Sequence, residues 1–218
     1  MKKDPQAFLK EEMTELRHNN LEWVIRHLEA GSKPHSVVDG REVLMLNTNN
    51  YLGLATHPKI VQASIDATKK YGAGAGAVPV IAGTFDLTRE FQEKFAKFKE
   101  VESSLLCQTG FAVNSGLIPM LVGKQDIVVS DELNHGSIID GVRLSGAKRV
   151  IYKHNDVGDL ERQLKEAEKE KARRICIITD GVFSMDGDMA PLPGIAKVAE
   201  EFGAMIFVDD CHGEGVLG

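Results

Sequence analysis

From about residue 104 onward, short apolar runs alternate along the chain with longer amphipathic stretches. Apolar strands that alternate with helices predict an α/β fold, in which a mainly parallel sheet is covered by helices on both faces. We expect strands near Ser104–Cys107, Ile127–Ser130, Arg149–Tyr152, Ile175–Thr179 and Met205–Val208. We expect helices near Gly110–Leu121, Ser137–Ser145, Asp159–Lys171 and Leu192–Phe202. This regular order constrains the fold more than any other feature of the chain.

The first 48 residues lack this alternation and predict an N-terminal arm without a core of its own. Apolar residues at roughly helical spacing predict a helix from about Pro5 to Ala30, which Gly31 would end. Asp39-Gly40 separates two further apolar runs, and this pair suits the two-residue turn of a β-hairpin. The arm is therefore expected to hold one helix and one hairpin.

Residues 49–218 are expected to form one large domain, and two helices precede its alternating part. Pro58 suits the first position of one helix, because the N–H that proline lacks would have no helical partner there. The other helix covers Leu87–Lys99 and would be capped by Asp86 or Thr84, since short polar side chains accept the free N–H groups of a helix start.

Composition is that of an ordinary globular protein and excludes several classes of function. The 218 residues carry a formal net charge of -6, which gives no footprint for nucleic acid. No apolar run is long enough for a bilayer and no secretory signal is visible, so we expect a cytoplasmic protein without a membrane partner. Unpaired cysteines at Cys107, Cys176 and Cys211 predict buried thiols in a reducing compartment. The histidines lack metal-ligand spacing, so no metal is expected.

Three polar segments directly follow apolar strands: Ser130–His135, Thr179–Asp188 and Val208–Gly213. Parallel strands place their carboxyl ends at one edge of the sheet, and open α/β sheets bind ligands at that edge. The acids and histidines of these segments are therefore expected to gather at one site.

Two positions at predicted helix starts have both a functional and a structural interpretation. Gly110 opens a helix after an apolar run, where free backbone N–H groups can bind an anion. Glycine is also common there for turn geometry alone. His135 precedes another helix start, where it could stack on an aromatic ring or donate a proton. A helix-capping or hydrogen-bonded loop histidine explains that position equally well.

The loop after Thr179 is crowded with polar residues, and loops at the carboxyl ends of strands often carry function. Ser184 is its least ordinary position, because this hydroxyl lies between the apolar Phe183 and Met185. Asp186-Gly187-Asp188 is interpreted as surface turn chemistry.

Asp209 and Asp210 directly follow the last predicted strand. Carboxylates at a buried strand end are unfavourable unless they are paired, and a cationic ligand nitrogen would pair one of them. His212 could contact a neighbouring ligand oxygen. Cys211 is interpreted as a small core-like side chain rather than a nucleophile. A metal-dependent hydrolase that uses Asp209, Asp210 and His212 is a third-ranked alternative, since no further ligand cluster is evident.

Three longer motifs occur in combination: Asn49-Asn50-Tyr51-Leu52-Gly53-Leu54, Thr179-Asp180-Gly181-Val182-Phe183-Ser184-Met185-Asp186-Gly187 and Val208-Asp209-Asp210-Cys211-His212-Gly213. With them the chain resembles the α-oxoamine synthases, which are pyridoxal-phosphate (PLP) enzymes of the aspartate-aminotransferase fold. The resemblance extends from the first motif to Gly218. It implies an enzyme that condenses an amino acid with an acyl-CoA and that is a homodimer when complete.

The resemblance implies roles around the cofactor ring. Asp209 would pair with the pyridinium nitrogen, and His135 would stack on the ring face. Ser184 and His212 would hydrogen-bond around the phenolic oxygen. His135 and His212 are also the expected catalytic residues.

The phosphate and the substrate are assigned by the same resemblance. Backbone N–H groups of Gly110 and Phe111 would hold the phosphate, and Asn50 would form part of the substrate end of the pocket. Glycine with acetyl-CoA is the expected substrate pair, because Asp180 stands where members that join alanine to a pimeloyl thioester more often have glutamate. The alanine and pimeloyl pair, used in the biotin pathway, is the alternative.

The resemblance also implies parts that this sequence does not contain. The Schiff-base lysine and the small C-terminal domain would lie beyond Gly218, so the fold is expected to be incomplete at its C-terminus. A strand from that part would pair with the strand before Gly110, and without it the chain is expected to associate through an exposed sheet edge. The alternative of another class is a non-catalytic fragment or assembly module.

Overall fold

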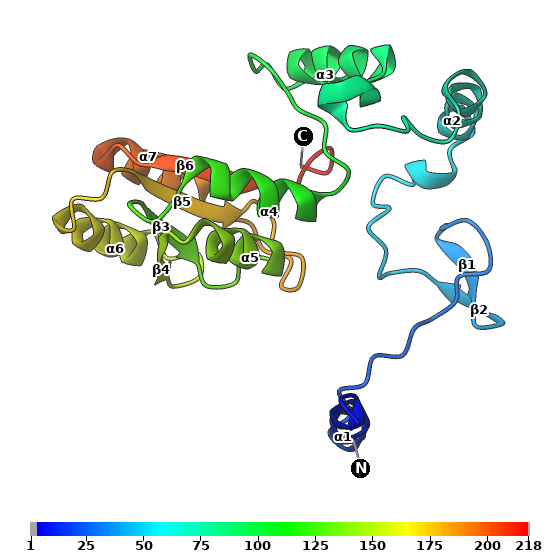
Figure 1. Cartoon of the computed structure of the whole chain (residues 1–218), viewed down its shortest axis with the longest axis horizontal. Coiled ribbons are helices and arrows are strands. Elements are labelled where there is room, and N and C mark those ends of the chain that lie inside the picture. Colours follow the sequence, from blue (N-terminus) through cyan, green and yellow to red (C-terminus); the bar gives the residue numbers. More distant parts are fainter. Residues whose placement is uncertain (1–3, 218) are drawn as a thin grey trace. The chain divides into compact units, whose positions relative to one another are not determined.

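A computed structural model describes residues 4–217, which divide into two compact units. The first unit ends at Lys70 and the second begins at Tyr71. Figure 1 labels the helices and strands of each unit. The expected boundary between residues 48 and 49 falls inside the first unit, and the division into an arm and a large domain stays a prediction. None of the described helices combines the length and the apolar character that crossing a membrane requires.

The first unit begins with helix α1, Ala7–His18, which is shorter than predicted. The expected helix from Pro5 to Ala30 is therefore wrong beyond His18. Asn20 has a φ of 54°, a left-handed conformation typical of helix ends. No residue of α1 is buried, so no packing against a core stabilises further helical turns.

The predicted hairpin of the first unit is confirmed. Strands β1 (His35–Val38) and β2 (Arg41–Leu44) pair in antiparallel orientation. Asp39 and Gly40 connect them with φ angles of 49° and 72°. Two successive positive φ angles are what the favoured two-residue hairpin turn requires, and Asp-Gly adopts them at little cost.

Four helices follow the hairpin before residue 100: η1 (Leu54–Thr56), α2 (Pro58–Tyr71), η2 (Pro79–Gly83) and α3 (Asp86–Phe98). Proline opens α2, as predicted. The predicted cap of α3 is wrong in position, because Phe85 is the residue before this helix, but the Asp86 carboxylate still accepts a first-turn N–H, that of Leu87, at 2.9 Å. Asp86 lies inside the first turn instead, and the Thr84 hydroxyl donates to the Pro79 carbonyl at 3.2 Å.

A four-stranded parallel sheet in the order β4-β3-β5-β6 forms the centre of the second unit. Its strands are β3 (Ile127–Asp131), β4 (Lys148–Tyr152), β5 (Ile175–Asp180) and β6 (Met205–Asp209). Its helices are α4 (Gly110–Leu121), α5 (Gly136–Ser145), α6 (Val157–Lys169) and α7 (Leu192–Phe202). The α/β class, four predicted strands and all four helices of this part are thus confirmed.

Helices cover both faces of this sheet, each over a separate apolar core (Figure 1). The core under α6 and α7 includes Val129, Leu160, Leu164, Ile177, Ile195 and Val198. The core under α4 and α5 includes Ile118, Val128, Ile138, Val142, Cys176 and Ile178. Successive strand residues point to opposite faces, so a strand covered on both sides is apolar throughout.

The fifth predicted strand, Ser104–Cys107, does not form. No strand among residues 4–217 pairs with this segment, and Leu105 is 85% exposed. A strand needs a neighbour, because its backbone N–H and C=O groups are otherwise satisfied only by water. An apolar run therefore does not suffice to make a strand here.

Burial is lower than predicted at the edge of the sheet. The edge strand β6 has three apolar side chains that are 36–40% exposed, those of Met205, Ile206 and Val208. The prediction of buried thiols holds only for Cys176. Cys107 is exposed because its segment forms no strand, and Cys211 is exposed because it lies in the turn after the edge strand.

Helices α4 and α5 approach each other closely at Gly141. A Cβ atom added to Gly141 would lie 2.4 Å from the backbone oxygen of Asn114, which is far inside van der Waals contact. Because Gly141 has no side chain, α4 can lie close to α5. The side-chain amide of Asn114 on α4 then donates to the Ser137 hydroxyl on α5 at 2.9 Å. Ser137 lines the candidate site, and Asn114 contacts residues that line it.

Candidate functional site

A small cavity lies at the carboxyl ends of β5 and β6, beside the starts of α4 and α5. Nine residues line it: Gly110, Phe111, His135, Ser137, Asp180, Ser184, Asp209, Cys211 and His212. The structure thus brings together every residue predicted for the cofactor and both predicted catalytic histidines, while their roles stay predictions. The cavity holds about 110 Å³, so a ligand of ordinary cofactor size would lie partly outside it.

Asp209, the last residue of β6, is fixed by two hydrogen bonds. Its Oδ2 accepts from Asn114 Nδ2 at 2.7 Å, and its Oδ1 accepts from the backbone N–H of Cys211 at 3.1 Å. Burial alone would raise the pKa of Asp209, but hydrogen bonds from Cys211 and Asn114 outweigh burial and leave this pKa below its ordinary value. Asp209 is therefore a charged carboxylate in a fixed orientation.

Asn114 and Ser137 connect Asp209 to His135. The Asn114 amide donates to both Asp209 and the Ser137 hydroxyl, and this hydroxyl lies 2.6 Å from His135 Nδ1. Asn114 and Ser137 are each 2% exposed, so water does not compete for these bonds. Neither residue was predicted as part of the site, because one polar residue inside a helix is no motif. The one sequence feature that could have indicated them is a polar residue on an otherwise apolar helix face.

His135 both lines the cavity and caps helix α5. Its Nδ1 accepts the backbone N–H of Ser137 at 3.2 Å, which confirms the helix-capping interpretation. Its own backbone N–H donates to Asp180 Oδ2 at 2.7 Å. The imidazole is thereby held at the cavity wall, so the capping role and a ligand-facing role are compatible.

Asp180, the last residue of β5, is a second carboxyl group in this cavity. Burial raises the pKa of Asp180 to about 6. The nearby charge of Asp209 also raises this pKa, whereas the hydrogen bond from the His135 backbone lowers it. The two carboxyl groups therefore differ in protonation behaviour. Asp209 stays charged, whereas Asp180 exchanges its proton close to neutral pH.

Gly110 and Phe111 form the first turn of α4 at the cavity. Thr109 caps this helix, because its Oγ1 accepts the backbone N–H of Ala112 at 3.0 Å. The first N–H groups of a helix have no carbonyl partner within it, and the helix dipole adds partial positive charge at this end. The start of α4 therefore has the geometry of an anion site.

Ser184 lies on the loop between β5 and α7, which folds back on itself. Phe183 N–H donates to the Asp188 carbonyl at 3.0 Å, and Gly187 N–H donates to the Phe183 carbonyl at 2.7 Å. The turn interpretation of Asp186-Gly187-Asp188 is thus confirmed but incomplete. The Asp188 carboxylate also contacts His154 Nε2 at 2.7 Å, a contact that no sequence pattern indicates.

Cys211 is exposed as a residue, yet its thiol is not activated. Burial of the sulfur, together with a hydrogen bond to Asp209 and the charge of that carboxylate, raises the pKa of Cys211 to about 12. Only a thiolate is an effective nucleophile. The expectation that Cys211 is no nucleophile is thus supported, although the side chain is not core-like.

Asn50 lies in the first unit and is engaged there. Its Nδ2 donates to the Ser32 carbonyl at 3.2 Å, and its Oδ1 accepts the Ala55 N–H at 3.1 Å. The expected place of Asn50 at the substrate end of the pocket stays a prediction.

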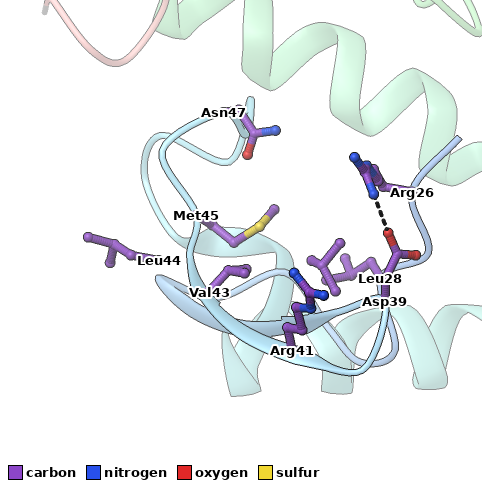
Figure 2. Close-up of a pocket in the computed structure, with 9 residues that line it drawn as sticks. Arg26, Leu28, Asp39, Arg41, Val43, Leu44, Met45 and Asn47 are labelled. Atoms are coloured by element: carbon purple, nitrogen blue, oxygen red, sulfur yellow. Dashed lines mark hydrogen bonds and ion pairs between the residues drawn. The ribbon is translucent and has the colours of Figure 1, made fainter. Parts of the chain in front are cut away.

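A larger cavity of about 620 Å³ lies beside the hairpin of the first unit (Figure 2). Two of its charged residues, Arg26 and Asp39, pair with each other at 3.1 Å, and Figure 2 shows mainly apolar side chains around them. It contains none of the predicted site residues. Volume alone therefore does not make this cavity the candidate site.

The groups around the small cavity fit a phosphorylated pyridine cofactor. A charged carboxylate can pair with a protonated ring nitrogen, an imidazole can cover a ring face, and a helix start can bind a phosphate. Asp209, His135 and the first turn of α4 provide these three groups. Within residues 4–217, no group of three or more His, Cys, Asp or Glu side chains could hold a metal ion.

Comparison with known proteins gives several relatives of high similarity. The 8-amino-7-oxononanoate synthase of Symbiobacterium thermophilum is 54% identical over 211 residues, which are 97% of this chain and 54% of that protein. The protein of the same name from Thermosipho melanesiensis is 54% identical over 207 residues, which are 95% of this chain and 52% of that protein. This chain therefore spans about half the length of these curated relatives.

Solved structures of related enzymes share the fold. Serine palmitoyltransferase from S. paucimobilis, with a bound PLP–myriocin aldimine, gives a TM-score of 0.84 at 30% identity, over 94% of this chain and 52% of that chain. An 8-amino-7-oxononanoate synthase from Francisella tularensis gives a TM-score of 0.61 at 29% identity, over 74% of this chain and 43% of that chain. The predicted resemblance to α-oxoamine synthases is confirmed. The family model for aminotransferase class I and II matches residues 41–218, and the chain belongs to that family.

Proposed function

We propose that this chain forms the PLP-binding part of an enzyme that condenses an amino acid with an acyl thioester. One observation carries the proposal. A single cavity at the carboxyl ends of the strands gathers the six residues that the family resemblance assigns to the cofactor: Gly110, Phe111, His135, Ser184, Asp209 and His212. The relatives named above support the same class of reaction.

Asp209 and His135 are proposed to hold the ring. The lowered pKa of Asp209 keeps its carboxylate charged, so this group would hold a proton on the ring nitrogen. His135 would cover one ring face, because its backbone is tied to Asp180 and its imidazole to Ser137. Bound PLP supplies an electron sink for the charge that develops at the amino-acid Cα.

The remaining polar groups of the cavity are proposed to orient the ring and to handle protons. Ser184 and His212 would hydrogen-bond to the ring oxygen, and the N–H groups of Gly110 and Phe111 would bind the phosphate. His135 and His212 are the proposed groups that hold or move a proton near the reacting atoms. Asn50 is proposed for the substrate end.

Alanine with a pimeloyl thioester is the leading substrate pair. The relatives at 54% identity are named 8-amino-7-oxononanoate synthase, whereas glycine with acetyl-CoA is supported only at the level of the family. Glycine with acetyl-CoA stays the second candidate because of Asp180, which occupies the cavity wall where the pimeloyl-using members more often have a longer acid.

A homodimer and a cytoplasmic location complete the proposal. Large apolar side chains are widely exposed on the second unit, including Leu105 at 85% and Met120 at 80%. Exposed apolar surface of this extent is typical of chains that bury it against a partner.

The test measures CoA release by the polypeptide as its gene encodes it, in the presence of PLP. We expect release with alanine and pimeloyl-CoA at least about tenfold faster than with glycine and acetyl-CoA, a ratio that specific acyl pockets commonly reach. The opposite order would favour the second candidate. No release with either pair, although PLP is bound, would favour the non-catalytic alternative.

A further inference from the structure

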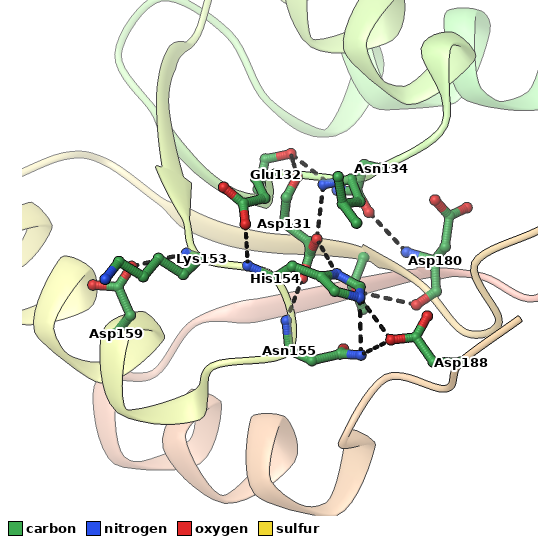
Figure 3. Close-up of polar contacts among 12 residues, drawn as sticks. Asp131, Glu132, Asn134, Lys153, His154, Asn155, Asp159, Asp180 and Asp188 are labelled. Carbon is green, nitrogen blue, oxygen red and sulfur yellow. Dashed lines mark hydrogen bonds and ion pairs between the residues drawn. The ribbon is translucent and has the colours of Figure 1, made fainter. Parts of the chain in front are cut away.

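A second polar cluster lies next to the candidate site, around His154 at the end of β4. The imidazole of His154 bridges two carboxylates (Figure 3). Its Nδ1 lies 2.9 Å from Asp131 Oδ1, and its Nε2 lies 2.7 Å from Asp188 Oδ2. Asp131 ends β3, whereas Asp188 belongs to the loop that carries Ser184. His154 therefore joins the sheet to that loop.

The sheet side of this bridge is rigid. The Asp131 side chain has no exposed surface, and its carboxylate also accepts the backbone N–H groups of Leu133 at 2.9 Å and Asn155 at 3.0 Å. The ring of Phe183 meets that of His154 edge to face, with centroids 4.4 Å apart. The imidazole is thus fixed by hydrogen bonds at both ring nitrogens and by the aromatic contact with Phe183.

The loop side of this bridge contacts the turn that carries Ser184. Asn155 Nδ2 donates to Asp188 Oδ2 at 2.8 Å and reinforces the contact from His154. The Asp188 carbonyl in turn accepts the Phe183 N–H, one residue before Ser184. Ser184 itself lines the cavity. A short chain of direct contacts therefore runs from Asp131 through His154 and Asp188 to the turn that presents Ser184.

The two acids on either side of His154 favour the protonated form of its imidazole. Three charged groups contact His154. The Asp131 and Asp188 carboxylates contact its ring nitrogens, and the Glu132 carboxylate accepts the backbone N–H of His154 at 2.9 Å. Burial opposes protonation of His154, but hydrogen bonds to Asp131 and Asp188 outweigh it, so its pKa is raised. A protonated imidazole can donate to both acids at once, whereas a neutral imidazole can donate to only one of them.

We propose that His154 is a positioning residue for the candidate site, which holds the loop from Gly181 to Ala190 in the conformation that presents Ser184 to the bound cofactor. The proposal rests on the proposed function only for the identity of that cofactor. The contacts that hold the loop are present in the chain without a ligand.

Hydrogen–deuterium exchange tests the holding of the loop directly. In His154→Gln we expect the amides of residues 183–190 to exchange about tenfold faster, as the loss of charge-assisted hydrogen bonds allows. Amides of Ile175–Asp180 in β5 should be unchanged, because the cores under the sheet are intact. The matched control is His18→Gln, the same replacement at an exposed position of α1, which should leave both segments unchanged.

Asp188→Asn provides a second variant that keeps the size of the side chain. It should accelerate exchange of the same loop, and by a smaller factor, because an amide oxygen can still accept from His154. Unchanged loop exchange in both variants would overturn the proposal. Equal acceleration of the loop and of β5 would also overturn it, since His154 would then contribute only to overall stability.

The pH dependence separates positioning from packing. Since the pKa of His154 is raised and that of Asp188 is lowered in the folded chain, the stabilisation is complete at mildly acidic pH, where both groups are charged, and is lost as pH rises through the pKa of His154. Loop opening in the wild type, corrected for intrinsic exchange, should therefore increase with pH, and His154→Gln should not show this increase. PLP should bind about tenfold more weakly to His154→Gln. If the wild type binds no PLP, the proposed function fails, while the exchange result still decides the role of His154.

Discussion

The buried amide of Asn114 donates a 2.7 Å hydrogen bond to the Asp209 carboxylate, and so ties helix α4 to the end of β6. The same amide reaches Ser137 on α5, so three separate elements meet at one side chain. This contact helps to keep Asp209 charged, since hydrogen bonds to a carboxylate favour its ionised form. The charge at the candidate site therefore depends on a residue that does not itself line the cavity.

Replacement of Asn114 should weaken cofactor binding. Asn114→Leu keeps the volume of the side chain but removes the donor, so Asp209 loses a hydrogen bond and becomes a weaker acid. We expect the Kd for PLP, measured by absorbance titration, to rise about tenfold. Asn19→Leu, the same replacement at an exposed position just after α1, is the matched control and should leave the Kd unchanged. Equal Kd values for Asn114→Leu and the wild type would refute this role.

Gly141 should tolerate no side chain. Gly141→Ala places a Cβ atom 2.4 Å from the Asn114 backbone oxygen, so α4 and α5 must separate. We expect a loss of about 1–3 kcal/mol in the free energy of unfolding, measured in urea, together with weaker PLP binding. Gly116→Ala on α4 is the control, since nothing lies within 4 Å of the added atom. It should be neutral or stabilising by up to about 1 kcal/mol.

Asp180 should oppose folding at neutral pH. Because burial raises its pKa to about 6, the folded chain favours the protonated carboxyl, and the stabilisation present below pH 4 is lost as pH rises through 6. Asp180→Asn can still accept the His135 N–H. It should be more stable than the wild type by up to about 2 kcal/mol at pH 7.5 and equally stable at pH 4.

Urea unfolding at pH 4 and pH 7.5 checks this difference. The half-exposed Asp140 of α5 provides the control, and Asp140→Asn should change stability little at either pH. A difference between Asp180→Asn and the wild type that is the same at both pH values would contradict the assignment.

The open edge of β6 should make the chain self-associate. Its apolar side chains are partly exposed, and an unpaired edge offers free N–H and C=O groups to a second chain. Sedimentation velocity should show a mass that rises with concentration, and Ile206→Lys should reduce this rise. Leu144→Lys removes a similarly apolar and more exposed side chain on α5, 67% against 40% for Ile206, and should have less effect. A compact monomer at every concentration would contradict the prediction.

Local patterns in the sequence sufficed to predict most of the second unit. Strands such as Ile127–Asp131 are apolar on both faces, which leaves a doubly covered parallel sheet as the arrangement that buries them. The sheet in turn places Asp180 and Asp209 side by side, because β5 and β6 pair in register. The gathering of the predicted site residues follows from that topology.

The errors arose where a segment depends on partners that are distant in the sequence. The apolar run Ser104–Cys107 lacks a neighbouring strand, and the chain beyond His18 has no core against which a helix could pack. Asn114 and His154 act through contacts 95 and 34 residues away, to Asp209 and Asp188. No local pattern predicts such pairs.

The central claim is that Asp209 holds a bound PLP ring, and PLP titration of this chain and two variants tests it most directly. We predict saturable one-to-one binding to the wild type, at least about tenfold weaker binding to Asp209→Ala, and wild-type binding to Asp210→Ala, which alters the exposed neighbouring acid. Absence of saturable binding to the wild type, or equal affinity of the wild type and Asp209→Ala, would contradict the claim.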